Sequence, residues 1–239
     1  MRILFIQSIL DQETELRVLL ALIALFGVGS VFTLLITLIK RQLKINMVLL
    51  KKEYEAQIEN AVLNFVFNNN EETIADFIQN PNAKKILFQK LAIKYCIVLH
   101  QNYSGTIQDK VLDFLTRTHL IEYSRKKLHA TFWKHKIEAI RDLSTLKDRN
   151  SIALIQEALT NLNQKIAIEA IIALIKFNGI AAVTHLKKFN IIIDEWSQAL
   201  ILSVIKNNKV PYDNQIEVLR NSKNKSLQVL ATRIIKFYN

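Results

Sequence analysis

Three lysines recur at a fixed spacing in the C-terminal part of the chain, and lysine ammonium groups can bind phosphates or carboxylates. Lys176, Lys206 and Lys236 are 30 residues apart, and each follows a pair of aliphatic residues. If these segments are stacked helices, the three side chains form a row with steps of about 10 Å. Such a row suits phosphates, a nucleic-acid backbone or an acidic protein tail. The alternative is that duplication of the repeat copied a lysine that is simply solvated.

A second group of basic residues is mixed with aromatic ones between residues 125 and 136. Basic side chains next to aromatic rings can form a nucleic-acid or membrane-interface surface. The alternative is structural: Phe132 and Trp133 begin the buried face of a helix, and the charges form its wet face. The candidate basic and aromatic patch consists of Arg125, Lys126, Lys127, Trp133, Lys134 and Lys136.

No arrangement of residues predicts an enzyme. The five histidines are not spaced as zinc ligands, and the single cysteine, Cys96, excludes a cysteine cluster. Phosphate-cradling glycine loops and G-x-S-x-G elbows are missing outside the apolar N-terminal segment. Neighbouring acids such as Asp194 and Glu195 fit a helix start, where capping and the helix dipole favour them. We predict no catalytic site, no metal and no cofactor.

The composition favours an all-α fold. Glycine occurs four times and proline twice in 239 residues, too few for the turns of a many-stranded fold. Of the 32 basic and 21 acidic side chains, two basic and three acidic lie in residues 1–39, so residues 40–239 carry a net charge of +12. The lone cysteine fits a reducing compartment for this part of the chain.

A segment near the N-terminus is long and apolar enough to cross a membrane. Val18–Ile39 has 22 residues and no ionisable side chain, which as a helix gives about 33 Å against a hydrocarbon core of about 30 Å. A cleaved signal peptide would have a shorter apolar core, and a buried core helix of this length is unusual in so small a domain. The sequence predicts one transmembrane helix at 18–39. Residues 1–17 precede it, and we expect the first ten at the outer interface.

The flanking charges predict the orientation of this helix. Three acidic residues precede it, and a run of basic residues follows it before the first acid, Glu53. The positive-inside rule then places the N-terminus outside and the C-terminal domain in the cytoplasm, as a single-pass protein of the inner membrane. The juxtamembrane basic residues are Lys40, Arg41, Lys44, Lys51 and Lys52.

Two features could bring a second helix alongside the first. Gly29, Thr33 and Thr37 put small side chains on one face of the span, which permits close packing but is also common in any transmembrane helix. Residues 40–67 should continue as a basic helical stalk. Its apolar stripe either forms a short homodimeric coiled coil or docks onto the following domain. The stripe comprises Leu43, Met47, Leu50, Tyr54, Ile58, Ala61 and Phe65.

Residues 71–125 are helical in pattern but show no clear repeat. Three asparagines at 68–70 interrupt the stalk. We expect a short helix from Glu71 to Gln79, a second that begins at Pro81 and reaches His100, a loop at 102–105, and helices from Ile107.

Residues 126–239 repeat with a period of about 30 residues. Each unit has a short amphipathic stretch, a polar turn and a longer helix. One such pair cannot bury its own apolar face, but stacked neighbours form a continuous core, as in an α-solenoid. The short stretches are Ile152–Leu159, Ala182–Phe189 and Asn214–Leu219, which end in Asn161, Asn190 and Asn221.

The repeats resemble the HEAT-repeat family. The motifs are Trp133-x-x-Lys136-x-x-Ala139-Ile140-x-x-Leu143, Glu169-Ala170-x-x-Ala173-Leu174-Ile175-Lys176-Phe177-x-Gly179 and Glu195-Trp196-x-Gln198. The resemblance covers residues 126–239 and implies a solenoid whose longer helices line the concave face. The chain lacks the usual proline early in each first helix and the central Asp and Arg pairs. With its single span it is also similar to single-pass HEAT-repeat proteins of Bacteroidetes-type bacteria, some of which occur beside membrane glycosyltransferase genes.

These patterns predict a membrane-tethered cytoplasmic scaffold or adaptor that binds a protein partner. The partner would be a membrane glycosyltransferase or another inner-membrane complex. One alternative is a nucleic-acid-binding or base-modifying HEAT-like protein, which the positive charge suits but which lacks evident catalytic acids and base contacts. Another is a basic surface held against anionic lipid.

Overall fold

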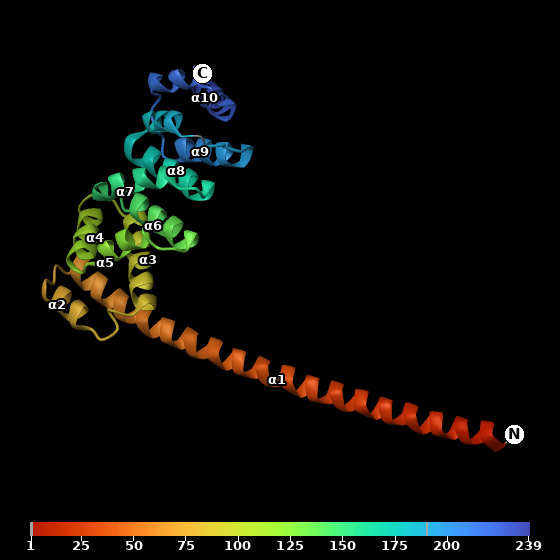
Figure 1. Cartoon of the computed structure of the whole chain (residues 1–239). Helices are drawn as coiled ribbons and strands as arrows, with labels where there is room; N and C mark the ends of the chain where they lie inside the picture. The colour runs from red at the N-terminus through yellow and green to blue at the C-terminus, as the bar shows by residue number, and fades with distance from the viewer. Residues whose placement is uncertain (1, 190) are drawn as a thin grey trace. The chain divides into compact units, whose positions relative to one another are not determined.

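The computed structural model describes the backbone of residues 2–189 and 191–239, and the side chains of these residues apart from 2–15 and 18. The protein is 81% helical and the described part has no strand, so the all-α prediction is confirmed. Figure 1 shows its two units, Met1–Ala56 and a compact unit of Gln57–Asn239. The interfacial position expected for side chains 1–10, and Asn190, lie outside the described residues.

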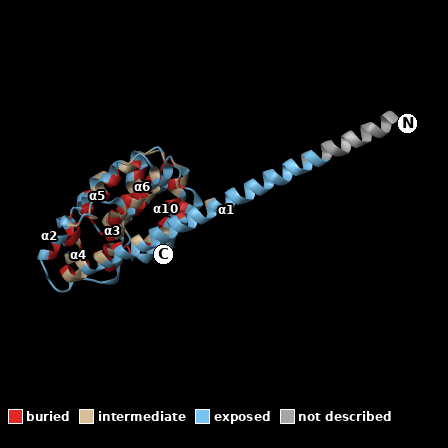
Figure 2. Ribbon diagram, turned by 90° about the horizontal axis from the view of Figure 1, so that it is seen from below, coloured by how far each residue is buried: buried red, intermediate tan, exposed pale blue. Residues whose placement is uncertain are grey.

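The first helix, α1, runs from Arg2 to Val66 without a break. Up to residue 49, the described side chains of α1 are exposed apart from the half-buried Ile36, and Figure 2 draws most of this helix in the colour for exposed residues. Phe26 is 74% exposed and Phe32 63%. The core helix of a soluble domain would bury such side chains, so that alternative does not describe α1. Within the described chain, α1 is the helix that is long and apolar enough to cross a membrane.

The two threonines of the predicted packing face turn their hydroxyls into α1 itself. Thr33 Oγ1 donates to the carbonyl oxygen of Ser30, and Thr37 Oγ1 to that of Thr33, both at 2.8 Å. Both hydroxyl donors are thus satisfied inside the helix, as hydrocarbon requires. A Cβ added at Gly29 would meet no atom within 4 Å, so the chain itself does not require a glycine there. Packing of another helix on this face stays a prediction.

The apolar stripe of the stalk divides into an exposed and a buried part. Leu43 and Met47 are 59% and 46% exposed, whereas Ile58 and Phe65, which belong to the compact unit, are buried. The end of the stripe belongs to the core of the compact unit, where the Phe65 ring lies 5.6 Å from that of Phe114. Docking therefore accounts for this end, and a homodimer stays a prediction for the exposed part.

Four helices follow α1, and one of them begins later than predicted. Instead of starting at Pro81, the second of them starts at Ile86. The Asn80 side chain accepts a hydrogen bond from the backbone N–H of Asn82 at 2.8 Å, which holds residues 80–85 in turns. These helices are α2 (Glu72–Gln79), α3 (Ile86–Asn102), α4 (Thr106–Arg117) and α5 (Leu120–Lys127).

Longer helices then alternate with shorter elements, which follows the predicted repeat. The longer helices are α6 (Trp133–Thr145), α8 (Gln164–Asn178), α9 (Glu195–Asn207) and α10 (Lys225–Tyr238). The shorter elements are η1 (Arg149–Ser151), α7 (Ile152–Glu157), η2 (Ala158–Thr160), η3 (Ile180–Lys188) and η4 (Asn214–Asn221).

Four of the shorter elements are 3₁₀-helices, and η3 and η4 are the longest of them. In η3 the buried residues Ile180, Val183 and Leu186 are three apart, and in η4 the buried pair is Ile216 and Leu219. Side chains three residues apart share one face of a 3₁₀-helix, which has three residues per turn. This spacing therefore lets a tighter helix bury these larger apolar residues on one side, while Val218 of η4 stays exposed.

Neighbouring repeats are in contact and start their long helices alike. Helix α8 packs against α6, α7, η3 and α9, while η3 packs against η4 and η4 against α10. Asn163, Asp194 and Asn224 cap α8, α9 and α10, and each side chain accepts a backbone N–H two or three residues later. The helix start predicted at Asp194 is thus confirmed.

We expect Phe114→Ala to lower the free energy of unfolding by about 3–5 kcal/mol, because it removes a fully buried ring. The Phe114 ring also lies 5.1 Å from that of Phe77. Cys96, the chain's one thiol, is fully buried, and burial raises its pKa. A maleimide reaches this buried thiol only when the protein opens. Each loss of ~1.4 kcal/mol of stability raises the population of the open state tenfold, so maleimide labelling of Cys96 should be at least a hundredfold faster in Phe114→Ala. Val218→Ala, at an exposed site, is the control and should change the rate little.

Candidate functional site

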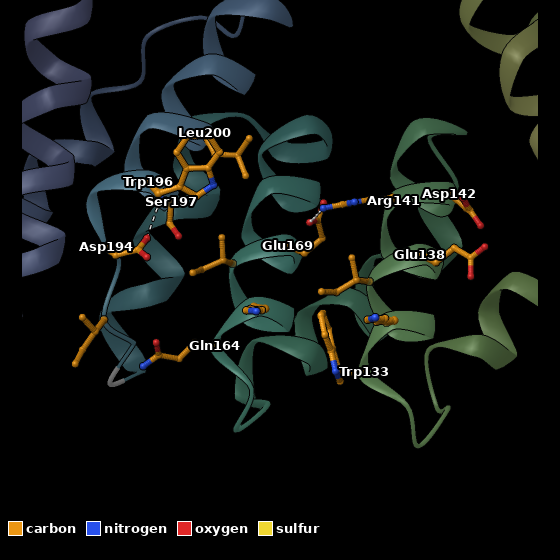
Figure 3. A pocket seen from close by; sticks show the side chains of 15 residues that line it. Trp133, Glu138, Arg141, Asp142, Gln164, Glu169, Asp194, Trp196, Ser197 and Leu200 are labelled. Atoms are coloured by element: carbon orange, nitrogen blue, oxygen red, sulfur yellow. Dashed lines mark hydrogen bonds and ion pairs between the residues drawn. The ribbon is translucent and has the colours of Figure 1, made fainter. Parts of the chain in front are cut away.

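A groove of about 680 Å³ lies over three long helices, α6, α8 and α9. Figure 3 shows Trp133 at the start of α6, Glu169 on α8, and Trp196 with Leu200 on α9. The chain has two tryptophans, and both line this groove. The groove lies within the compact unit and is the candidate site.

One end of the groove is apolar and open to solvent. Trp196 is 78% exposed, Ile192 62% and Leu200 37%, and Ile168 is half-buried beside them in the lining. Covering a large apolar side chain stabilises a complex by about 1.5–3 kcal/mol before the costs of association. This end can therefore hold bulky apolar groups of a ligand.

The other end joins an aromatic ring to two cations. Lys134 Nζ lies 5.6 Å from the centroid of the Trp133 ring, and Lys165 Nζ lies 5.1 Å from it. The two lysines come from α6 and α8, and both are exposed. Across the described residues, neither lysine has a carboxylate within 4.0 Å, so both ammonium groups can take an anion.

Two acids on the α6 side are occupied by a buried lysine. Lys127 Nζ lies 3.1 Å from Glu138 Oε2 and 3.5 Å from Asp142 Oδ2. Burial acts to raise the pKa of Glu138, but the hydrogen bond and charge of Lys127 outweigh it and lower that pKa. For Asp142, which is deeper, burial outweighs the attraction of Lys127 and raises the pKa to about 6.

The other two acids of the groove are also committed. Arg141 Nη2 donates to Glu169 Oε2 at 2.6 Å, which ties α6 to α8 and raises the pKa of Arg141. Asp194 caps α9 and accepts the N–H of Ser197 at 2.8 Å, and these hydrogen bonds lower its pKa. The cations without an acidic partner in the groove are therefore Lys134 and Lys165.

The predicted basic and aromatic patch is divided by the fold. Arg125 donates to both carboxylate oxygens of Asp148, at 2.9 and 2.8 Å, and Lys127 is buried, so these two residues are structural. Lys126 is exposed. Lys136 lines a separate pocket of about 230 Å³.

Trp133 and Lys134 are the members of the predicted patch that line the groove. The prediction that Phe132 begins a buried helix face was wrong. Phe132 precedes α6 as its N-cap residue and is 51% exposed. Trp133 is half-buried and presents its ring to the groove rather than to the core.

The predicted lysine row lies elsewhere on the repeats. Lys176, Lys206 and Lys236 lie in the last turns of α8, α9 and α10, where the helix dipole favours a cation. None of the three lines the groove. Lys176 is half-buried, and burial lowers its pKa, whereas Lys206 and Lys236 are exposed. Binding by this row stays a prediction.

Several groove residues were missed by sequence reasoning, although a signal existed. Lys134, Ile137 and Glu138 of α6 are each 31 residues before Lys165, Ile168 and Glu169 of α8. The repeat of 31 residues thus relates three pairs of groove residues, as well as residues of the core. Trp196 was noted as a family motif rather than as an exposed surface residue.

A second basic hollow was also missed. A pocket of about 540 Å³ at the ends of η3 and η4 is lined by Lys187, Lys188 and Lys223, with no acidic residue in its lining.

Metal-binding geometry is absent from the described residues, where no three His, Cys, Asp or Glu side chains converge. No protein-family model matches the chain, and no curated protein is similar to it in sequence.

The raised pKa of Asp142 predicts a pH-dependent stability. The folded protein holds this proton up to about pH 6, whereas an ordinary aspartate has a pKa of 3.8. The folded state therefore binds the proton more tightly, and stability from this group is lost as the pH rises from about 4 to 6. Relative to Asp142→Asn, wild type should lose up to about 3 kcal/mol of unfolding free energy over this range.

Urea denaturation followed by circular dichroism at several pH values measures this difference. Asp76→Asn removes an exposed carboxylate and is the control for the loss of one charge. A difference between wild type and Asp142→Asn that grows in the opposite direction would show that Lys127 outweighs burial.

Proposed function

We propose that the protein is a membrane-tethered scaffold that binds a protein partner in the groove over α6, α8 and α9. The observation that carries the proposal is that both tryptophans line one groove, Trp196 exposed and Trp133 half-buried. Large exposed apolar surfaces on soluble domains commonly mark interaction sites. Tryptophan in particular is enriched among the residues that dominate binding energy at interfaces.

A HEAT-like α-solenoid is the architecture that we propose for residues 126–239. Three observations support it: the period of about 30 residues, the contacts of α8 with elements on both sides, and the matching caps of α8, α9 and α10. In such a stack each helical pair completes the core of its neighbour. The long helices then present one continuous face, and the groove occupies part of it.

The anchor that we propose is Val18–Ile39, with the compact unit in the cytoplasm of a bacterial cell. Its apolar side chains have no cover in the described chain, which bilayer lipid would provide. Lys40, Arg41 and Lys44 follow directly and are exposed, so the positive-inside rule supports this orientation. Partners in the same inner membrane, such as a glycosyltransferase complex, would meet the groove at raised effective concentration.

The acids of the groove make nucleic acid a poorer ligand for it. Glu138, Asp142, Glu169 and Asp194 all line the same hollow as the two lysines. A nucleic-acid backbone carries a charge at every phosphate and would lie against these carboxylates. A protein segment, by contrast, can carry a single acidic side chain and place it next to the two lysines, away from these carboxylates.

Removal of residues 1–44 should leave a folded helical protein that no longer fractionates with membranes. The compact unit begins at Gln57, so its core stays intact. Differential centrifugation and carbonate extraction measure the distribution, and circular dichroism checks the fold. Retention of the truncated protein on membranes would contradict the anchor and favour direct binding of the basic surface to lipid.

Purification of the full chain in mild detergent should recover a stoichiometric membrane partner through the groove. The double variant Trp133→Ala, Trp196→Ala should lose that partner, because it removes both rings from the lining. Phe237→Ala, an exposed aromatic residue outside the groove lining, is the matched control and should retain it. Equal recovery with wild type and the double variant would place the partner's contact outside the groove.

A further inference from the structure

We propose that the occupant of the groove is a short linear segment with an acidic side chain at one end and a bulky apolar side chain at the other. The inference rests on the proposed function and adds the chemistry of the partner. The groove has two cations without an acidic partner beside Trp133, and exposed apolar side chains on α9 next to Asp194, whose carboxylate is occupied by the cap of that helix. A ligand that fits should therefore have a matching two-part character.

The acidic side chain is assigned to the end where Trp133 lies between two lysines. Lys134 and Lys165 come from different helices, yet both ammonium groups lie within 5.6 Å of the same ring centroid. A carboxylate can accept a charge-assisted hydrogen bond from either lysine, and the charge of the other ammonium group adds to the attraction. Because these are the groove's cations without an acidic partner, an added carboxylate gains attraction without breaking an ion pair.

The apolar side chain is assigned to the end formed by α9. Trp196 and Leu200 present exposed side chains there, one helical turn apart. The cationic end lies on α6 and α8 and the apolar end on α9, so one to two helix-packing distances of about 8–10 Å, roughly 10–20 Å, separate them. An extended segment covers that length with about three to six residues.

The middle of the groove restricts the ligand to an isolated charge. Arg141 and Glu169 form an ion pair across α6 and α8, so the Glu169 carboxylate lies on the central helix of the groove (Figure 3), whereas Glu138 and Asp142 share Lys127 on the α6 side. A second acid in the middle of the ligand would approach these carboxylates, whereas small neutral residues would not. The expected order is therefore acid, neutral spacer, apolar group.

The chain offers its own reporters for a binding test, since its two tryptophans both lie in the groove. Full-length protein in detergent micelles is titrated with a synthetic peptide of two glutamates, four alternating glycines and serines, and a leucine–phenylalanine pair. One comparison peptide replaces the glutamates by lysines, and another replaces the leucine–phenylalanine pair by serines. Tryptophan emission is recorded in each titration.

The first peptide should change the emission saturably, and each comparison peptide should bind at least tenfold more weakly. The double variant Lys134→Glu, Lys165→Glu should bind the glutamate peptide at least tenfold more weakly and the lysine peptide more tightly than wild type does. Both lysines are exposed, so folding should be unaffected, which slow maleimide labelling of Cys96 verifies. Lys206→Glu with Lys236→Glu makes the same change of charge outside the groove and should leave binding unchanged.

The direction of the ligand is tested with a quencher on the glutamate end of the peptide. In Trp196→Phe the emission comes from Trp133 alone and should be quenched strongly. In Trp133→Phe it comes from Trp196 and should be quenched less, because the quencher lies at the far end.

Equal binding of the glutamate and lysine peptides, no binding of either, or no effect of the charge reversal would overturn the inference. The proposed function is judged separately, by loss of the co-purified partner in the tryptophan double variant. A partner that is lost there, together with peptides that show no preference for acid, would leave the groove as a binding site and reject only the acidic ligand.

Discussion

The middle of helix α8 is buried on all sides, and the neighbouring repeats pack around it. Six consecutive residues, Ala170–Ile175, are buried, which is more than one full turn. No single neighbour can cover a helix all round, so α8 needs partners on several faces, and it has them in α6, α7, η3 and α9. Its two ends are more open: Lys176 in the last turn is half-buried, and Gln164 and Lys165 in the first turn are exposed and line the groove. Helix α8 thus contributes its middle to the core and its N-terminal part to the groove.

The groove follows from this packing and is held before any ligand arrives. Since α6 and α9 both pack against α8, side chains of all three helices line one groove. The Arg141–Glu169 pair at 2.6 Å fastens α6 to α8, and the Asn163 and Asp194 caps fix where α8 and α9 begin. A site whose walls are already in place loses little conformational entropy on binding. Such a preformed site can bind selectively through a few contacts, without burying a large area.

Patterns along the chain predicted the features that depend on local periodicity. The unbroken helix past residue 39, the alternation of short and long elements, and the helix start at Asp194 all follow from residues close together in sequence. What could not be predicted depends on partners far along the chain. Arg125 and Lys127 looked like surface charges because Asp148, Glu138 and Asp142 come 11 to 23 residues later. The start of α3 was misplaced for a smaller reason, because an Asn80 side chain outweighed a proline signal.

The proposed anchor and the proposed binding groove complement each other energetically. A hollow of about 680 Å³ takes only a few side chains, and contacts of that size give modest affinity. Two partners confined to one membrane, however, meet at an effective concentration that for linked modules reaches about the millimolar range. A weak and selective groove is then well occupied when its partner shares the bilayer and empties otherwise. On this argument the apolar helix is part of the recognition mechanism, because it decides which of the segments that fit the groove are ever bound.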